Sequence, residues 1–268
     1  MPNLKVLDLR LINHVDDQDS TGTLVSGKGI ICSGHDSSGP TSPTEFLRRL
    51  VRFQATHLAP EDHVLEYLPA SLQSLSLARL PYRLEPRMLR IGLSPKSVLE
   101  RLKQGHFPSL KILRLWYNIR QPADLENEKE LLDFLPAQFP SLQQLELCRR
   151  WSHGVDSLEE LWDPLPLACA LVSQLKELEV FRFDPDLPGL DGYLPFTYLT
   201  KKYHETIGRL HVMASAIAKE APWLKRIDMY SEFGSDSTLY WEMWFVVRDD
   251  DGNVELDRPP PPLVDRPY

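Results

Sequence analysis

Leucine recurs in one short pattern along the chain, and the pattern predicts a series of short strands. It reads Leu-x-x-Leu-x-Leu, with Val, Ile or Met at some positions, and occurs six times. The copies span residues 4–9, 72–77, 110–115, 142–147, 175–180 and 224–229. The fourth and sixth residues of a copy are apolar, as on a strand that buries one face. We therefore expect the third, fifth and seventh residues to point to the opposite face.

The spacing of the copies indicates a repeated unit of irregular length. Their starts lie 68, 38, 32, 33 and 49 residues apart, beyond the about 20–29 residues of the commonest leucine-rich repeats. The first interval is twice 34, so it has room for a further, degenerate copy. Leucine occurs 45 times in the 268 residues, which suits units that bury their leucines against neighbouring units.

The segments between the copies have the apolar period of helices. Residues 94–105 begin with Ser-Pro, place Val98, Leu99 and Leu102 on one face, and end with Gly, as a capped helix does. Further helices are predicted over residues 43–53, 128–134, 157–162, 167–175 and 202–220.

Proline marks three of the corners between helix and strand. Pro108, Pro140 and Pro222 each stand two residues before the first leucine of a copy, and proline cannot continue a helix. A strand–helix unit repeated about six times, with parallel strands, predicts an α/β leucine-rich-repeat solenoid. We expect a horseshoe like that of ribonuclease inhibitor, with the strands on the concave face and the helices outside.

Two segments fall outside the repeat. Residues 14–42 are rich in Gly, Ser, Asp and Thr and predict an irregular insertion in a solenoid that spans 1–236. Residues 238–248 have the β-branched and aromatic content of a strand, and an Asp-rich turn and a second short strand follow. We expect 237–257 to form a hairpin cap, because terminal repeats need one, and 258–268 to form a Pro-rich tail.

Composition narrows the classes of function. With 42% hydrophobic and 25% charged residues, the chain is typical of a soluble globular protein. No run approaches the ~18 apolar residues that a membrane span needs. The net charge of −8 argues against nucleic acid as a partner, because neutralising phosphates requires a basic face. Three scattered cysteines favour neither a disulfide framework nor a zinc site, and we expect a cytoplasmic or nuclear protein.

Two glycine-rich stretches come near catalytic motifs without matching them. Residues 22–29 resemble a phosphate-binding loop, but Gly29 stands where Ser or Thr would hold magnesium. Residues 34–39 lack the Gly-x-Ser-x-Gly spacing of hydrolases. We therefore expect a protein that is not an enzyme, with no catalytic residue and no cofactor. The alternative is an enzyme that uses residues 14–42 as a nucleotide or acyl site.

Other candidate chemistry has a simpler explanation. Cys148 and His153 lie five residues apart, but the sequence suggests no third group to orient the imidazole. The Asp-rich turn before Gly252 would place Val247 and Arg258 where a calcium loop needs carboxylates. No two histidines have the His-x-x-x-His spacing of a zinc site. The sequence therefore predicts no metal site.

Three stretches carry a resemblance to a known family. They read FPSLKILRL at 107–115, FPSLQQLEL at 139–147 and WEMWFVVRDDDGNVEL at 241–256. Together with the long, irregular repeats, they make residues 1–256 resemble the leucine-rich-repeat regions of fungal F-box-type proteins, many of them from mushroom-forming species.

The resemblance implies a role in recognition. In that family an F-box segment docks a ubiquitin-ligase adaptor, and the repeats that follow recruit the target. Here the chain opens within a repeat, at Leu4, and we therefore expect it to contain no F-box. The resemblance therefore implies a target-binding scaffold, with a ligase adaptor as partner only if an F-box lies upstream. A truncated gene product without independent function is a further alternative.

The concave strand face is the predicted binding surface. Equivalent positions on stacked strands lie about 4.8 Å apart, so the fifth positions predict a mostly acidic row and the seventh a row with aromatic residues. Aromatic residues beside charges are typical of protein-binding hot spots. We expect a protein partner with a basic patch, bound by Trp116, Phe181, Tyr230, Arg114, Glu146, Glu179, Asp228, Arg149, Arg150 and Trp151.

Overall fold

The structure is a computed structural model, and it describes residues 4–9, 47–56, 58, 62–77, 93–151, 163–186, 201–231 and 240–259. Several sequence predictions lie outside these residues. They are the insertion at 14–42 with its two glycine-rich stretches, the helix at 157–162, His153 and the tail beyond 259.

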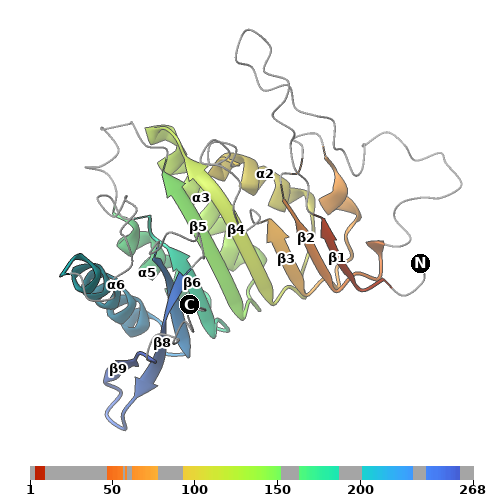
Figure 1. Ribbon diagram of the computed structural model, residues 1–268. Helices are drawn as coiled ribbons and strands as arrows, with labels where there is room; N and C mark the ends of the chain where they lie inside the picture. Colours follow the sequence, from red (N-terminus) through yellow and green to blue (C-terminus); the bar gives the residue numbers. More distant parts are fainter. Residues whose placement is uncertain are drawn as a thin grey trace, which may run out of the picture.

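In these described ranges, nine strands form one open sheet in which every strand pairs with its neighbours in the sequence (Figure 1). Strands β1 to β7 are parallel, and β8 and β9 run antiparallel at one edge. The strands are β1 Val6–Leu9, β2 Arg52–Ala55, β3 Ser74–Leu77, β4 Ile112–Ile119, β5 Gln144–Trp151, β6 Val180–Asp184, β7 Arg226–Ser231, β8 Tyr240–Arg248 and β9 Val254–Asp257. The predicted parallel pairing of the leucine-rich strands is confirmed.

The helices connect consecutive parallel strands and lie on one side of the sheet (Figure 1). In the described residues a 3₁₀-helix, η1, precedes β3, and an α-helix precedes each of the strands β4 to β7. Because such crossovers are right-handed and the strand order never reverses, all of them fall on the same face. The helices are η1 Val64–Tyr67, α2 Pro95–Gln104, α3 Pro122–Gln138, α5 Pro164–Gln174 and α6 Lys201–Glu220.

A hydrogen-bonded turn precedes each of the strands β2 to β7. The N–H of the first leucine of the unit donates to the carbonyl three residues earlier, over 3.0–3.2 Å. The pairs are Leu50 to Leu47, Leu72 to Pro69, Leu110 to Phe107, Leu142 to Phe139, Leu178 to Leu175 and Leu224 to Ala221. The chain therefore enters six successive strands through the same local geometry.

The start of each parallel strand pair is also the same. One carbonyl just before a strand accepts two successive N–H groups from the next strand, over 2.8–3.1 Å. The accepting residues are Lys5, Val51, Gln73, Lys111, Gln143 and Glu179. Because each carbonyl holds two donors, the register cannot slip without breaking both bonds, and a slip of one residue would also expose the buried leucines.

The buried leucines of neighbouring strands form one continuous core with the helices. Leu110, Leu113 and Leu115 of one unit are all buried, as are their counterparts in the next. Helix α2 confirms its prediction: Ser94 caps its first turn by accepting from the Ser97 N–H at 3.2 Å. Its predicted apolar stripe packs into the same core.

The helix predicted over residues 43–53 is wrong in its second half. Arg52–Ala55 is strand β2, which pairs with β1 and β3. Leu50, Phe53 and Ala55 are buried at the first, fourth and sixth positions, so this is the degenerate copy expected in the first interval. Apolar residues three apart are compatible with a helix and also with the turn and strand of a repeat. The spacing alone therefore did not distinguish these two structures.

The copy predicted at residues 175–180 is displaced by three residues. The pairing of β6 with β5 places Phe181 opposite Leu145 and Phe183 opposite Leu147. The buried pattern is therefore Leu178-x-x-Phe181-x-Phe183. The sequence favoured the earlier register because Leu175 and Leu178 also satisfy the pattern, whereas in the structure Leu175 belongs to the turn before the strand.

The C-terminal hairpin forms as predicted and continues the sheet at β7. Asp249 closes its turn by accepting from the Asn253 N–H at 2.7 Å, and Gly252 takes a φ of 80° that favours glycine. Trp244 of β8 is buried. Arg248 donates to three carbonyls near the end of α6, those of Ala218, Ala221 and Leu224, over 2.9–3.2 Å.

Candidate functional site

Counted from the first leucine of each repeat, the fifth residues in β4 to β7 form a row of alternating charges. The row lies on the strand face, which is the face of the sheet that points away from the helices. Arg114 pairs with Glu146, Glu146 with Arg182 and Arg182 with Asp228. We call these four residues the charge row. The prediction of a mostly acidic row is wrong, because the shifted register of β6 places Arg182 there in place of Glu179.

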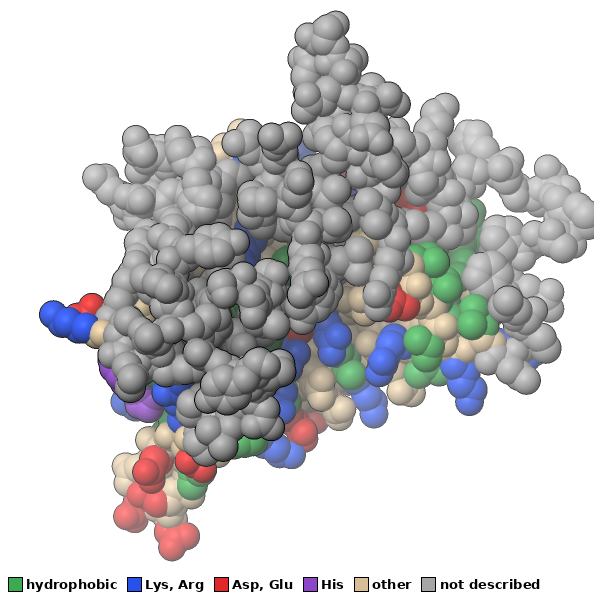
Figure 2. Space-filling model, viewed as in Figure 1, with side chains coloured by type: hydrophobic (Ala, Val, Ile, Leu, Met, Phe, Trp, Pro, Cys, Tyr) green, Lys and Arg blue, Asp and Glu red, His purple; other side chains and the backbone are tan. Residues whose placement is uncertain are grey.

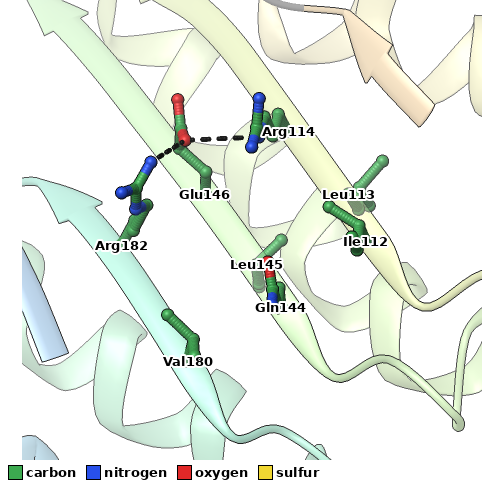
Figure 3. A pocket seen from close by; sticks show the side chains of 8 residues that line it. All are labelled: Ile112, Leu113, Arg114, Gln144, Leu145, Glu146, Val180 and Arg182. Carbon is green, nitrogen blue, oxygen red and sulfur yellow. Dashed lines mark hydrogen bonds and ion pairs between the residues drawn. The ribbon is translucent and has the colours of Figure 1, made fainter. Parts of the chain in front are cut away.

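Ion pairs connect the whole charge row, and Figure 3 shows those that Glu146 makes with Arg114 and Arg182. Glu146 Oε2 lies 3.5 Å from Arg114 Nε and 3.2 Å from Arg182 Nη1. Arg182 also donates from Nε to Asp228 Oδ2 at 2.9 Å. Arg226, the third residue of its repeat and the first of β7, places its Nε 3.0 Å from Asp228 Oδ1. Each carboxylate therefore lies between two guanidinium groups.

The Arg182 guanidinium is a fixed positive charge. Burial alone would lower its pKa, but Asp228 and Glu146 attract the cation more strongly, and the net effect raises the pKa. Because arginine is already charged at any physiological pH, it neither gives nor takes a proton here. The row can thus orient and attract charged groups, but its arginines supply no acid–base chemistry.

Arginine–aromatic contacts extend this network toward the hairpin. The Arg150 guanidinium lies 4.8 Å from the Tyr230 ring centroid and 3.1 Å from Asp184 Oδ2. Tyr230 contacts Trp241 edge to face, with centroids 5.6 Å apart, and the Arg182 guanidinium lies 5.4 Å from the Trp241 ring. These contacts fix the arginines in place, since such cation–π pairs contribute about 0.5–2 kcal/mol each.

Several predicted site residues do lie on the strand face. Arg114 and Glu146 occupy the predicted fifth positions, and Trp116 is half-buried at the seventh position of β4. Tyr230 is on the same face but is buried beneath its partners. Asp228 holds the predicted position and is buried under Arg182 and Arg226, so it cannot be a direct contact for a partner.

Phe181 and Glu179 do not occupy the positions predicted for them. Phe181 is fully buried in the core and stacks on Phe183, with centroids 5.5 Å apart. Glu179 stands before β6, exposed, and pairs with Lys225 at 2.7 Å. Both corrections follow from the three-residue shift in register, which turns an expected surface aromatic into a core residue.

The segment after the fifth position of β5 divides between the two faces. Arg149 points to the helix side and is buried against Glu128 of α3, so its prediction as a binding residue is wrong. Alternation along a strand places Arg150 on the strand face, where it pairs with Asp184 and Asp186. Trp151 ends β5 opposite Ile119, and its side chain lies outside the described part of the structure.

Cys148 has no catalytic character. It is fully buried at the seventh position of β5, and burial, with Asp184 and Glu146 nearby, raises the pKa of its thiol well above the ordinary value. The thiolate is the reactive form of cysteine, so this side chain stays protonated and inert at neutral pH. Such a thiol cannot serve in the thiol–imidazole pair considered with His153.

Several described residues of the strand face were missed in the sequence, and the following four bear most on the site. They are Arg182, Arg226, Trp241 and Phe245. The sequence does contain a signal for Arg182. Leu175 corresponds to Phe107 and Phe139, the residues that begin the turn before the strand. Aligning these three residues gives the correct register of β6. The residues of β8 belong to this face only because the hairpin pairs with β7, and that pairing is a tertiary feature.

A shallow hollow lies within the charge row (Figure 3). It is lined by Ile112, Leu113, Arg114, Gln144, Leu145, Glu146, Val180 and Arg182. Its enclosed volume is about 10 Å³, roughly what one water molecule needs. Small-molecule sites enclose about 300–1,000 Å³, so this hollow cannot enclose a metabolite.

Two further features were sought in the described ranges. No three His, Cys, Asp or Glu side chains gather there closely enough to hold a metal ion. Of the helices described, none combines the length and the apolar content that crossing a membrane requires.

The strand face is thus a charged and aromatic surface, and the hollow described on it is shallow. Its function is inferred from those residues themselves, because no protein-family model, curated protein or solved structure matches the chain.

Proposed function

We propose that this protein is a leucine-rich-repeat solenoid that acts as a non-catalytic scaffold and binds a protein partner on its strand face. The scaffold resembles the target-binding repeats of F-box ubiquitin-ligase receptors. In this proposal a ligase adaptor takes part only where an F-box segment accompanies the repeats.

The repeated backbone geometry supports the solenoid. Six turns and six two-donor carbonyls recur along the parallel strands, and each unit buries its leucines against the next. Such units have no core of their own and become stable by stacking. The helices cover one face, which leaves the strand face to present side chains at fixed spacing.

The charge row is the observation that carries the proposal. Its ion pairs and the neighbouring arginine–aromatic contacts hold charged groups in fixed positions on the strand face. Ordered arginine and aromatic side chains are enriched in protein interfaces and their hot spots. The hollow between them is too small to enclose a metabolite.

Affinity purification with matched variants tests the proposal. The strand-face variant Arg114→Ser/Phe245→Ser removes one basic and one exposed apolar side chain. The control Lys129→Ser/Val212→Ser makes the same change on exposed positions of the helices. We expect wild type and control to recover the same proteins from a lysate, and the strand-face variant to lose at least one by about tenfold or more.

The folded state of each variant is checked by circular dichroism and urea unfolding. Equal recovery of all proteins by the strand-face variant would remove the support for binding on this face. Loss of the same proteins by the helix-side control would place the interface on the other side of the sheet.

A further inference from the structure

The ion pairs of the strand face are unequally exposed. Arg114 is 42% exposed and Glu146 only 12%, and Arg182 and Arg226 are each 31% exposed above an Asp228 that is 1% exposed. The longer arginine side chains extend over the shorter carboxylates. An approaching molecule therefore meets guanidinium groups first, although the row contains as many acids as bases.

These guanidinium groups retain capacity for a ligand. Each guanidinium has five N–H donors, whereas the ion pairs seen here use the Nε of Arg114, the Nε and Nη1 of Arg182 and the Nε of Arg226. With Arg226 included, three cations face two carboxylates. These five side chains therefore carry net positive charge. Arg150 beside them pairs with Asp184 and Asp186, whose carboxylates are only 3% and 11% exposed.

Apolar side chains lie between and beside the arginines. Ile112 and Val180 are two residues before Arg114 and Arg182 on the same strands, and all four line the hollow (Figure 3). The visible lower part of the strand face in Figure 2 likewise shows Lys and Arg side chains interspersed with hydrophobic ones. Such a surface suits a ligand that alternates charged and apolar groups.

The same character continues onto the hairpin. Phe245, paired with Arg226, is 43% exposed, and Val247 is 47% exposed. Exposed carboxylates lie next to these two residues on β9, where Asp257 pairs with Phe245 and Glu255 with Val247. From β4 to β8 the surface crosses four strand spacings, about 19 Å at about 4.8 Å each. An extended segment of roughly six residues, at about 3.3 Å each, spans it.

We infer that the strand face from β4 to β8 binds an acidic segment of the partner protein, in which Asp or Glu alternates with apolar residues. The inference rests on the proposed function and names the chemistry of the partner. Carboxylates of the segment pair with Arg114, Arg182 and Arg226, and its apolar residues cover the hollow and Phe245. The basic partner expected from the sequence depended on an acidic row, and that row is not present.

A random twelve-residue peptide library displayed on phage and selected on the purified full chain tests this inference. The variant Arg114→Gln/Arg226→Gln removes two cations while Glu146 and Asp228 each keep Arg182 as a partner. The control Lys129→Gln/Lys219→Gln removes two cations from exposed helix positions. Enriched peptides are then synthesised with a fluorescent label, and their Kd is measured by anisotropy.

We expect the enriched peptides to be rich in Asp and Glu. Their Kd should rise on the order of tenfold in the arginine variant and at high salt, and should stay within about twofold in the lysine control. A third variant, Phe245→Ser, should also weaken binding.

The other outcomes separate the two proposals. Neutral or basic peptides whose binding is lost in Phe245→Ser would overturn the acidic partner and support binding on the strand face. Peptides that bind all variants equally would overturn both. Enrichment of no peptide would overturn the acidic segment, because the library contains such segments, and it would leave the purification experiment to decide the broader proposal.

Discussion

Arg149 of β5 and Glu128 of α3 form a bidentate ion pair inside the protein. Arg149 Nε donates to Glu128 Oε1 at 2.5 Å and Nη2 to Oε2 at 2.6 Å, and the Tyr117 hydroxyl donates to Oε1 at 2.7 Å. Burial would lower the pKa of Arg149, but the Glu128 carboxylate outweighs it and raises that pKa. The pair therefore joins a helix to two strands through three hydrogen bonds to one carboxylate.

Neutralising this carboxylate should destabilise the fold strongly. Glu128→Gln keeps the shape and an acceptor for Tyr117 but leaves the buried Arg149 cation without its counter-charge. We expect a loss of about 3–5 kcal/mol of unfolding free energy, measured by urea denaturation. Adding Arg149→Met should make the double variant less destabilised than the sum of the two single changes. A loss below about 1 kcal/mol for Glu128→Gln would mean that the pair is exposed to water.

The Tyr117 phenol should make stability fall at alkaline pH. Burial, followed by the charge of Glu128, raises its pKa well above the ordinary value of about 10. Above about pH 10 the unfolded chain loses this proton while the folded protein keeps it, so unfolding becomes more favourable as the pH rises. The slope is at most about 1.4 kcal/mol per pH unit.

Tyr117→Phe removes that slope and serves as the comparison. The difference in unfolding free energy between wild type and the variant is first measured at pH 8. Between about pH 10 and 11 this difference should change in favour of the variant, because only wild type carries the buried phenol. Parallel curves over this range would show that the phenol is not held protonated by the fold.

The register of β6 can be tested by two adjacent truncations. Phe181→Ala should cost about 3–5 kcal/mol of stability because it opens a cavity in the core. Val180→Ala, on the strand face, should cost less than about 1 kcal/mol. The opposite order of effects, measured by urea unfolding, would restore the register in which Val180 is the inward residue.

Arg248 should anchor the hairpin to α6. Arg248→Met keeps the aliphatic stem but removes the hydrogen bonds to the carbonyls of Ala218, Ala221 and Leu224. We expect a loss of about 1–3 kcal/mol, with faster hydrogen exchange in Tyr240–Arg248 and in the last turn of α6. Asp250→Asn, at the exposed turn, is the control and should leave exchange unchanged. Equal exchange in both variants would mean that strand pairing alone holds the hairpin.

Cys148 should resist alkylation in the folded protein. In a Cys32→Ser/Cys169→Ser variant, iodoacetamide should label Cys148 at least about tenfold more slowly in buffer than in denaturant. The cause is burial together with a raised pKa, and each unit of pKa reduces the thiolate at neutral pH about tenfold. Rapid labelling in buffer, followed by mass spectrometry, would reveal an accessible thiolate.

Local signals in the sequence predicted most elements correctly. The Leu-x-x-Leu-x-Leu copies at 110–115 and 142–147 mark β4 and β5, since alternation on a strand leaves one buried face. Ser94 and Gly105 mark the ends of α2 through capping, which depends on neighbouring residues alone. The aromatic and β-branched stretch before the Asp-rich turn likewise marked the hairpin.

The candidate site was predictable only where the register was clear. Arg114 and Glu146 were identified because their strands follow unmistakable Phe-Pro-Ser-Leu corners. At β6 two registers satisfied the leucine pattern. The predicted register placed Phe181 on the surface, whereas in the structure Phe181 is inward and Arg182 is on the surface. Arg149 was misplaced for a different reason: a charged residue is expected at the surface unless a buried partner is known, and Glu128 lies on another element.

The sequence by itself determined the alternation of strands and helices and the apolar face of each, because these depend on the period of nearby side chains. Tertiary structure decided which charges meet. Glu146 pairs with arginines on two other strands, and Trp241 reaches Arg182 through an antiparallel hairpin. Ion-pair partners are set by strand pairing across tens of residues, and exposure is set by which side chain lies uppermost, so neither can be read from local order along the chain.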